Sequence, residues 1–261
     1  MTSPLFVKKK KPKKKRNAFL DWLGYAGLRI LVGIMHLSSV ETNLRFARFL
    51  GRLLWKHYDR GRQRALDNLR ASYPDKSEQW YEETGRKSCE QLAMLAVDII
   101  FTPRLVKKNN WRKYSRFKNT ERAKWMSKEG KGLIFVGAHY GNFEIAGYMM
   151  GLFGFNVYSI ARPLDNPYIS RYLYGVRERA GQKIIDKKGA AELFGKVASS
   201  GATIGFIADQ DAGEKGIFVD FFGRKASTYK SIGLLALTEN LPIVVGYARR
   251  IDDRFFFEIG C

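Results

Sequence analysis

Four short runs rich in Val, Ile and Phe, all in the second half of the chain, restrict most strongly what it can fold into. Each begins after a Gly, Asn or Pro turn signal and ends in polar residues: GLIFVGAH, GFNVYSIARP, SGATIGFIADQD and NLPIVVGYARR. Helix-like stretches lie between them, for example residues 167–180 and 190–199. Buried strands that alternate with helices are typical of α/β proteins. The pattern predicts an α/β core over residues 129–261, with a mixed, largely parallel sheet flanked by helices.

The first half of the chain is predicted to be helical, with three parts. Residues 1–16 contain the block KKKKPKKKR, whose self-repulsion favours a disordered basic tail. Residues 17–58 contain an apolar segment and then an amphipathic one with basic residues at steps of three and four, which indicates two helices. A helical pattern continues over residues 59–128, where Pro74 ends one helix and Ser77 caps the next.

The helices over residues 17–58 are interpreted as membrane-associated. A full bilayer crossing needs about 20 apolar residues, and Arg29 interrupts the apolar segment near its middle. Trp22, Tyr25, Arg29 and His36 fall on one helical stripe, which suits a helix lying among lipid headgroups. Positive charge on both sides favours a segment that dips into one leaflet and leaves the catalytic body in the cytoplasm. The alternative is an ordinary pair of core-packed helices.

The charge balance predicts an anionic partner. The chain has 46 Lys and Arg residues against 25 Asp and Glu residues, a formal net charge of +21. An acidic membrane surface, a phosphorylated substrate, an acidic protein and nucleic acid all fit this excess. A basic nucleic-acid-binding protein is the less favoured alternative, since it leaves the apolar N-terminal segment without a purpose.

Polar residues follow the predicted strands at the edge where α/β sheets bind ligands. They are His139, Arg162, Asp209 with Asp211, and Arg249. Because ligands of open α/β sheets bind beyond the carboxyl ends of the strands, we expect a base, cations and carboxylates to gather along one rim.

The motif GAHYGNFE at residues 137–144 is the strongest candidate for chemistry. Asn142 is predicted to cap a helix over residues 143–151, which places Glu144 in its first turn. The turn can fold the Glu144 carboxylate back onto the His139 imidazole, fixing its tautomer and leaving the other nitrogen free to accept a proton from an alcohol. The alternative is a hydrogen-bonded strand-end histidine beside a glutamate that only matches the helix dipole.

Other chemistries have weaker support. No metal site is predicted, since His36 and His57 are far from His139 in the sequence and no Cys pair is present. A G-x-S-x-G elbow, a Walker loop and a dinucleotide-binding glycine fingerprint are also absent from the sequence. Cys89 and Cys261 do not form a disulfide framework, and RFFFEIG before Cys261 has the pattern of an unfinished strand. We therefore expect the native chain to continue further.

Three motifs in order give the chain a resemblance to a known family: AHYGNFE, IARPLDNPYISRYLYGVRERAG and IADQDAGEKGIFVDFFGRKAST. With RALDNLRASYPDKS further upstream, the sequence resembles the lipid A biosynthesis late acyltransferases, part of the lysophospholipid acyltransferase superfamily with its HxxxxD/E signature. Members act at the cytoplasmic face of the inner membrane. They move a fatty acyl group from acyl carrier protein, or in some relatives from coenzyme A, to a hydroxyl group of a sugar or lipid.

The resemblance implies roles for five residues. His139 would be the general base and Glu144 its orienting partner, while Arg162, Asp209 and Asn142 would contribute to substrate binding. The acceptor would be a phosphorylated acyl-glucosamine lipid, with a lysophospholipid or a mannosylated phosphoinositide as alternatives, and the acyl thioester would be a co-substrate with no further cofactor. Phe143 stands where the family usually has Trp, and Phe221–Phe222–Gly223 is predicted to be core or hinge. A catalytically inactive membrane scaffold is the remaining alternative.

Overall fold

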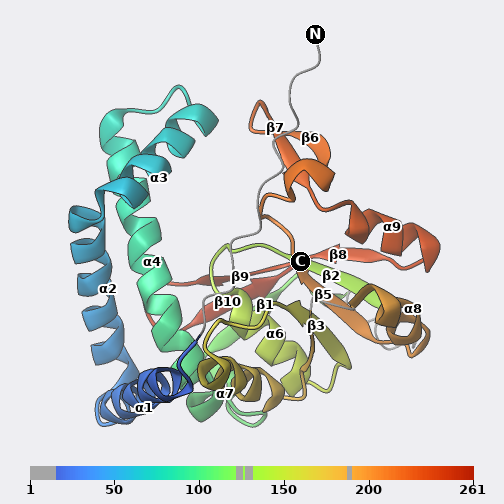
Figure 1. Cartoon of the computed structure of the whole chain (residues 1–261), viewed down its shortest axis with the longest axis horizontal. Coiled ribbons are helices and arrows are strands. Elements are labelled where there is room, and N and C mark those ends of the chain that lie inside the picture. Colours follow the sequence, from blue (N-terminus) through green and yellow to red (C-terminus); the bar gives the residue numbers. More distant parts are fainter. Residues whose placement is uncertain (1–15, 122–125, 127–131, 187–189) are drawn as a thin grey trace.

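The computed structural model describes residues 16–121, 126, 132–186 and 190–261 (Figure 1). The predicted tail over residues 1–16, apart from Arg16, and most of the predicted boundary near residue 129 lie outside the described residues. The described chain forms a helical arm (residues 18–105), an α/β core and a projecting hairpin (residues 217–228) (Figure 1).

A five-stranded parallel sheet forms the centre of the core and confirms the α/β prediction. Every pair of neighbouring strands in it is parallel. The four apolar runs all form strands, and the last one forms two, because a break at Gly246 divides it between two sheets. The strand order is β4 (Lys183–Asp186), β3 (Val157–Ala161), β5 (Thr203–Ile207), β2 (Leu133–Gly137) and β8 (Ile243–Val245). The helices of the core are α6 (Phe143–Leu152), α7 (Pro167–Glu178), α8 (Ala190–Ser199) and α9 (Lys230–Thr238).

A second sheet of three strands corrects the helical prediction for residues 59–128. After the short helix η1 (Trp111–Lys113), β1 (Ser115–Lys118) pairs in parallel with β10 (Phe257–Gly260), which pairs antiparallel with β9 (Tyr247–Arg250). The partner of β1 lies about 140 residues further along the chain, in the register Ser115↔Phe257. No local sequence pattern carries that pairing, so periodicity alone missed the strand. The RFFFEIG run does form a strand, as predicted.

Among the described residues, four α-helices precede this sheet: α1 (Ala18–Met35), α2 (Val40–His57), α3 (Asp59–Ser72) and α4 (Glu78–Leu105). Polar caps set two of the boundaries. Ser39 accepts a hydrogen bond from the backbone N–H of Thr42, and Ser77 accepts one from that of Trp80. The predicted break around Pro74, with Ser77 as the next cap, is confirmed.

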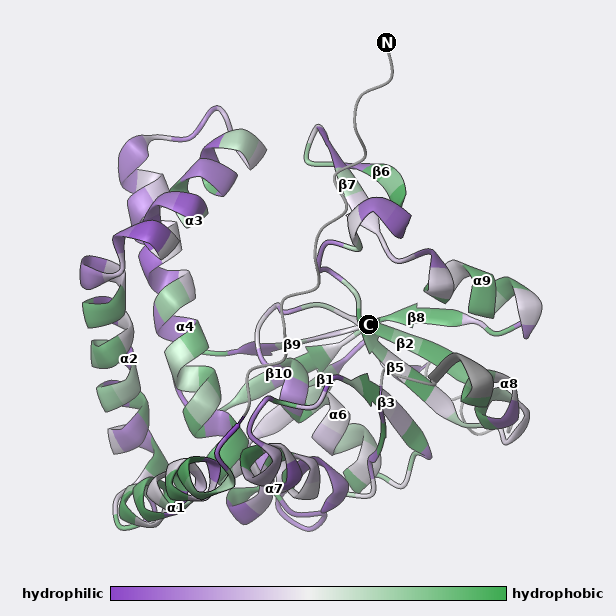
Figure 2. Cartoon of the chain, viewed as in Figure 1, coloured by the Kyte–Doolittle hydropathy of each residue, from purple (hydrophilic) through white to green (hydrophobic). Residues whose placement is uncertain are grey.

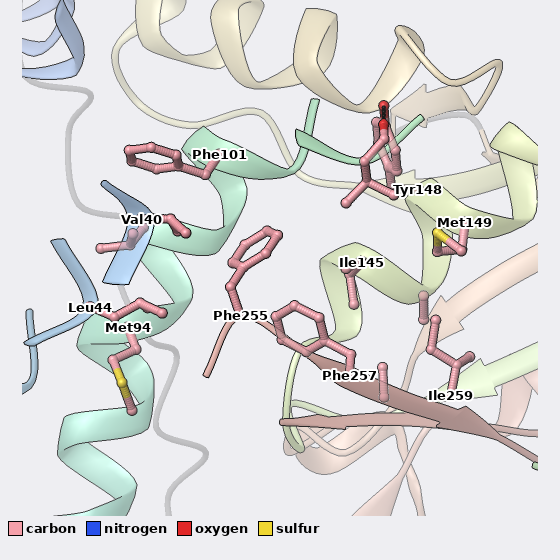
Figure 3. Close-up of a cluster of buried hydrophobic side chains, with 14 of the residues drawn as sticks. Val40, Leu44, Met94, Phe101, Ile145, Tyr148, Met149, Phe255, Phe257 and Ile259 are labelled. Atoms are coloured by element: carbon pink, nitrogen blue, oxygen red, sulfur yellow. Dashed lines mark hydrogen bonds between the residues drawn. The ribbon is translucent and has the colours of Figure 1, made fainter. Parts of the chain in front are cut away.

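The helical arm and the α/β core share one hydrophobic cluster (Figure 3). Leu44 of α2 and Phe101 of α4 belong to the same buried group as Ile145 of α6 and Phe257 of β10. Apolar burial contributes about 25 cal/mol per Å² removed from water, so this shared core ties α2 and α4 to the sheets. The predicted helical regions are therefore packed parts of the described fold.

Helix α1 is largely apolar (Figure 2). Most of its large apolar side chains are exposed. Only Val32 is buried among its 18 residues. The helix is long and apolar enough to cross a membrane by length and composition, with a mean hydropathy of 1.4. The predicted headgroup stripe differs: Arg29 lies over the ring of Tyr172, Tyr25 stacks on Tyr168, and His36 packs edge-on against Phe101. Tyr25, Arg29 and His36 thus make contacts within the protein, whereas Trp22 is exposed, as are many of the apolar side chains of α1.

Helix α2 packs with its small side chains inward. Ala47 and Gly51 are buried, and a Cβ atom on Gly51 would lie 2.7 Å from the Cα atom of Glu90 in α4. Two of its basic residues form ion pairs, Arg48 with Asp253 and Arg52 with Glu90. Val40 and Leu44 of α2 are also buried, whereas five of its large apolar side chains are exposed: Phe46, Phe49, Leu50, Leu53 and Leu54.

The hairpin of β6 (Ile217–Phe221) and β7 (Arg224–Thr228), which follows the short helix η2 (Gly213–Lys215), overturns the core assignment of Phe221–Phe222–Gly223. Phe221 and Phe222 are both exposed. The turn residues Phe222 and Gly223 both have positive φ angles, which bring the strands into a tight hairpin. The Phe222 ring meets the arm at Tyr73, with ring centroids 5.1 Å apart.

Candidate functional site

His139 lies in the turn between β2 and α6, two residues beyond the end of its strand. Asp209 lies two residues beyond the end of β5, the strand next to β2. The register pairs Gly137 with Ile207, so the two chains leave the sheet side by side. The expectation that His139 and Asp209 share the carboxyl rim of the sheet is confirmed.

Asp209 holds His139 by two hydrogen bonds. The His139 ring nitrogen Nδ1 lies 2.7 Å from Asp209 Oδ1, and the backbone N–H of His139 donates to Asp209 Oδ2 at 2.8 Å. An ionised carboxylate can only accept, so Nδ1 carries the proton, and Nε2 has no hydrogen-bond partner among the described residues. The His139 side chain is 42% exposed, and its ring packs against that of Phe143. The imidazole therefore has a fixed orientation and an accessible basic nitrogen.

The predicted contact between Glu144 and His139 is wrong in this structure. Both carboxylate oxygens of Glu144 accept hydrogen bonds from Arg177 of α7, at 2.9 and 2.5 Å. The first turn of α6 directs Glu144 toward α7, and a bidentate guanidinium is a stronger partner than an imidazole. Burial lowers the pKa of Arg177, but the hydrogen bond with Glu144 and the charge of that carboxylate raise it. The net effect is a pKa above the usual value. The carboxylate beside the imidazole is that of Asp209.

Asn142 caps α6 as predicted, since its Oδ1 accepts a hydrogen bond from the backbone N–H of Ile145. Its Nδ2 donates to Asp98 of α4 at 2.9 Å, and the side chain is buried. The assignment of Asn142 to substrate binding does not fit this burial, because both polar ends of the side chain are already used within the protein. Asn142 holds the turn that carries His139.

Asp98 anchors this turn from the helical arm. It forms a buried ion pair with Arg250 of β9 in addition to the bond from Asn142. Burial raises the pKa of Asp98 to about 6, against the lowering effects of Arg250 and Asn142. Asp98 and Arg177 were not identified from the sequence: Asp98 lies in none of the motifs, and Arg177 lies within IARPLDNPYISRYLYGVRERAG but was assigned no role there. For Asp98, the only available signal was an acidic residue within the apolar face of a predicted helix.

Gly141 is required where the turn approaches β9. Its φ angle is +63°, and a Cβ atom there would lie 2.1 Å from the backbone oxygen of Ala248. We expect Gly141→Ala to lower the free energy of unfolding by at least about 2 kcal/mol, since a left-handed conformation and a backbone clash act together. Thermal unfolding measures the loss. Gly154→Ala is the matched control, because φ is +83° there but no atom lies within 4 Å. Equal losses in the two variants would contradict the predicted role of the Ala248 contact.

The remaining rim residues have separate positions. Arg162 follows β3, is exposed, and has no hydrogen bond or ion pair from its side chain among the described residues. Asp211 accepts a hydrogen bond from the backbone N–H of Gly213, so it shapes a turn. Arg249 does not follow a strand as expected. It lies within β9 of the second sheet and pairs with Glu258 of β10.

An apolar cavity of about 530 Å³ opens near the other end of the same strands. It lies between Leu133 at the start of β2, Met149 near the end of α6 and Ile259 of β10. His139 and Asp209 follow the carboxyl ends of their strands, so this cavity is separate from the reacting groups.

Comparison with known proteins places this chain in a family. Residues 7–259 match the family described as bacterial lipid A biosynthesis acyltransferase. The chain belongs to this family. It is 23% identical to a lipid A biosynthesis acyltransferase of Haemophilus influenzae over 232 residues, which cover 87% of this chain and 70% of that protein. It is 27% identical to a lipid A biosynthesis myristoyltransferase of Escherichia coli over 220 residues, which cover 82% of this chain and 65% of that protein.

The matched region thus covers about two thirds of the length of these lipid A acyltransferases. The resemblance predicted from AHYGNFE and the later motifs is confirmed at the level of the family. The HxxxxE motif of this chain supplies the histidine of the site, His139. The carboxylate next to that histidine comes from Asp209, which lies outside the motif.

Proposed function

We propose that this protein is a membrane-associated acyltransferase that moves a fatty acyl group from an acyl thioester to a hydroxyl group of a phosphorylated lipid A precursor. The observation that carries the proposal is the hydrogen-bonded pair of His139 and Asp209 at the carboxyl rim of the sheet. The family supports acyl transfer in lipid A biosynthesis. The identities of the donor and of the acceptor are part of the proposal.

In the proposed reaction, Nε2 of His139 takes the proton of the acceptor hydroxyl while the hydroxyl oxygen attacks the carbonyl carbon of the thioester. A tetrahedral intermediate forms and collapses, the carbon–sulfur bond breaks, and the imidazolium returns its proton to the leaving thiolate. Asp209 stabilises the transient positive charge on the ring through Nδ1. The step requires no covalent enzyme intermediate.

Glu144 has a different part in this proposal from the one its motif suggests. Its bidentate pair with Arg177 joins α6 to α7, and thereby fixes the helix that begins next to His139. Arg162, exposed on the same rim, is free to bind an anionic group of either substrate.

Membrane attachment is supported by the outer faces of α1 and α2. The exposed side chains of α1 include Phe19, Leu20, Ile30 and Ile34, and those of α2 include Phe46, Phe49 and Leu53. Contiguous exposed apolar surface of this kind marks membrane or protein contacts. The net charge of +21 favours an anionic membrane at the cytoplasmic face of the inner membrane.

The test is an assay of the purified full chain in detergent micelles. We expect the lipid A precursor to gain the mass of one acyl group when an acyl thioester is supplied. The rates of transfer from the acyl carrier protein thioester and from the coenzyme A thioester are compared, and the thioester with the higher rate identifies the donor. A lysophospholipid and a phosphatidylinositol mannoside are compared as acceptors in parallel. Acylation of either of these but not of the precursor would contradict the proposed acceptor, and no transfer to any of them would contradict the reaction.

A further inference from the structure

The open face of the three-stranded sheet carries a row of alternating charges. Arg116 on β1 lies opposite Glu258 on β10, and Glu258 lies opposite Arg249 on β9. Side chains alternate between the two faces of a strand, so these three share one face. Phe257 and Ile259 point into the hydrophobic cluster on the other face. Arg116, Glu258 and Arg249 are called the charge row below.

Glu258 is the fixed centre of the charge row. Its side chain is 4% exposed, and it accepts hydrogen bonds from Arg249 Nε at 2.9 Å and from Arg116 Nε at 3.0 Å. Tyr247 Oη donates a further bond at 3.2 Å. The hydrogen bond from Arg249 is the largest of several effects that lower the pKa of Glu258 to about 2. The carboxylate is therefore ionised at neutral pH and holds both guanidinium groups in place.

Each arginine still has unused donors. Glu258 uses only Nε of Arg249, and Nε and Nη2 of Arg116. Within the described part of the chain, no acceptor is bound to the other guanidinium N–H groups of these two residues, whose side chains are 46% and 56% exposed. The row has one positive charge in excess. Preoriented guanidinium groups match the geometry of phosphate oxygens.

The charge row lies beside the turn that carries His139. Gly141 and Ala248 form a parallel bridge, and the backbone N–H of Asn142 donates to the Ala248 oxygen at 2.6 Å. Arg249 follows Ala248 directly, and His139 precedes Gly141 by two residues. The Cα atoms of His139 and Arg249 are thus on the order of 10 Å apart.

We propose that Arg249 and Arg116 bind a phosphate group of a substrate, with Glu258 as the residue that positions them. The proposal rests on the acyl transfer proposed above and names a contact that this site makes. A phosphate ester is available from two sources, the phosphorylated acceptor lipid and the phosphopantetheine arm of the donor. A purely structural charge ladder would stabilise the sheet equally well but would bind no anion.

Calorimetric titration of the purified full chain tests the site directly. The probes are glucosamine 1-phosphate against glucosamine, and pantetheine 4′-phosphate against pantetheine. We expect Arg249→Gln and Arg116→Gln each to weaken the binding of a phosphorylated probe at least tenfold, and to leave the unphosphorylated probe unaffected. Loss for the sugar phosphate assigns the site to the acceptor, and loss for pantetheine phosphate assigns it to the donor.

Arg254→Gln is the matched control, because Arg254 is an exposed arginine paired with an acid, Asp252, in the turn between β9 and β10. Glu258→Gln keeps both arginines but releases them, so binding should weaken several-fold. Equal affinity in wild type and Arg249→Gln, or an equal loss in Arg254→Gln, would overturn the site. Thermal unfolding of each variant shows that it is folded.

The titration needs no turnover, so the two proposals fail separately. Phosphate binding that depends on Arg249, in a protein that transfers no acyl group, would contradict the proposed reaction alone. An active protein whose Michaelis constants for both substrates are unchanged by Arg249→Gln would contradict the phosphate site alone.

Discussion

Replacing His139 with alanine should abolish acyl transfer while leaving the protein folded and bound to membranes. The imidazole is partly exposed at the end of β2 and belongs to neither hydrophobic cluster, so its removal costs little packing. A positioned general base typically contributes about 10²–10⁴-fold to a rate. Initial rates of acyl transfer measure the loss, and thermal unfolding and sedimentation with vesicles check the fold and the attachment. Full activity of this variant would remove the proposed mechanism.

Asp209→Asn and Glu144→Gln separate the two carboxylates. The asparagine keeps the shape but favours the wrong imidazole tautomer and loses the charge beside Nδ1, so we expect a fall in rate approaching that of His139→Ala. Glu144→Gln breaks the pair with Arg177, and its main effect should be on stability, by about 1–3 kcal/mol. The remaining folded protein should keep most of its rate.

The matched control for Glu144→Gln is Arg177→Met, which breaks the same pair from the other side. If Glu144 acts only through Arg177, the two variants should have similar rates when both are assayed well below their melting temperatures. A loss of rate in Glu144→Gln as large as that in Asp209→Asn, with Arg177→Met active, would show that Glu144 acts on His139 and would contradict the pairing described here.

The sequence predicted the rim but not the partners within it. Each strand that precedes His139 or Asp209 is a local apolar run, so its end could be found from residue patterns alone. The contact between them depends on β2 and β5 being neighbours, which is a property of the sheet order. Glu144 was chosen as the partner of His139 because it lies only five residues away in the sequence. That spacing gave no indication that Arg177, 33 residues further along the chain, would bind the Glu144 carboxylate.

Long-range pairings account for the other differences. β1 is too short to show a clear periodicity, and its partner β10 lies at the far end of the described chain. Arg249 follows an apolar run and was therefore expected at a strand end, but the break at Gly246 starts a new strand in another sheet. The sequence showed α2 as an amphipathic pattern and α1 only as an apolar segment. Which side faced the protein depended on small residues such as Gly51 meeting α4.

The largest stability effect is expected at the buried pair of Asp98 and Arg250. Asp98→Ala would leave the Arg250 guanidinium, whose side chain is 5% exposed, without its carboxylate. It would also remove the acceptor of Asn142 Nδ2. Breaking a buried ion pair from one side typically costs about 3–5 kcal/mol, because the remaining charge stays buried and uncompensated. Denaturant unfolding of the purified chain measures this difference.

Asp253→Ala is the control, since Asp253 is an exposed acid that pairs with Arg48 on the surface. An exposed pair contributes about 0–1 kcal/mol, so the two aspartates should differ several-fold in their effect. The double replacement Asp98→Leu with Arg250→Met should recover part of the stability, because it removes both buried charges. It should not recover the transfer rate, since Asn142 would still lack the partner that holds the His139 turn against α4. Recovery of both stability and rate would show that the pair serves the fold alone.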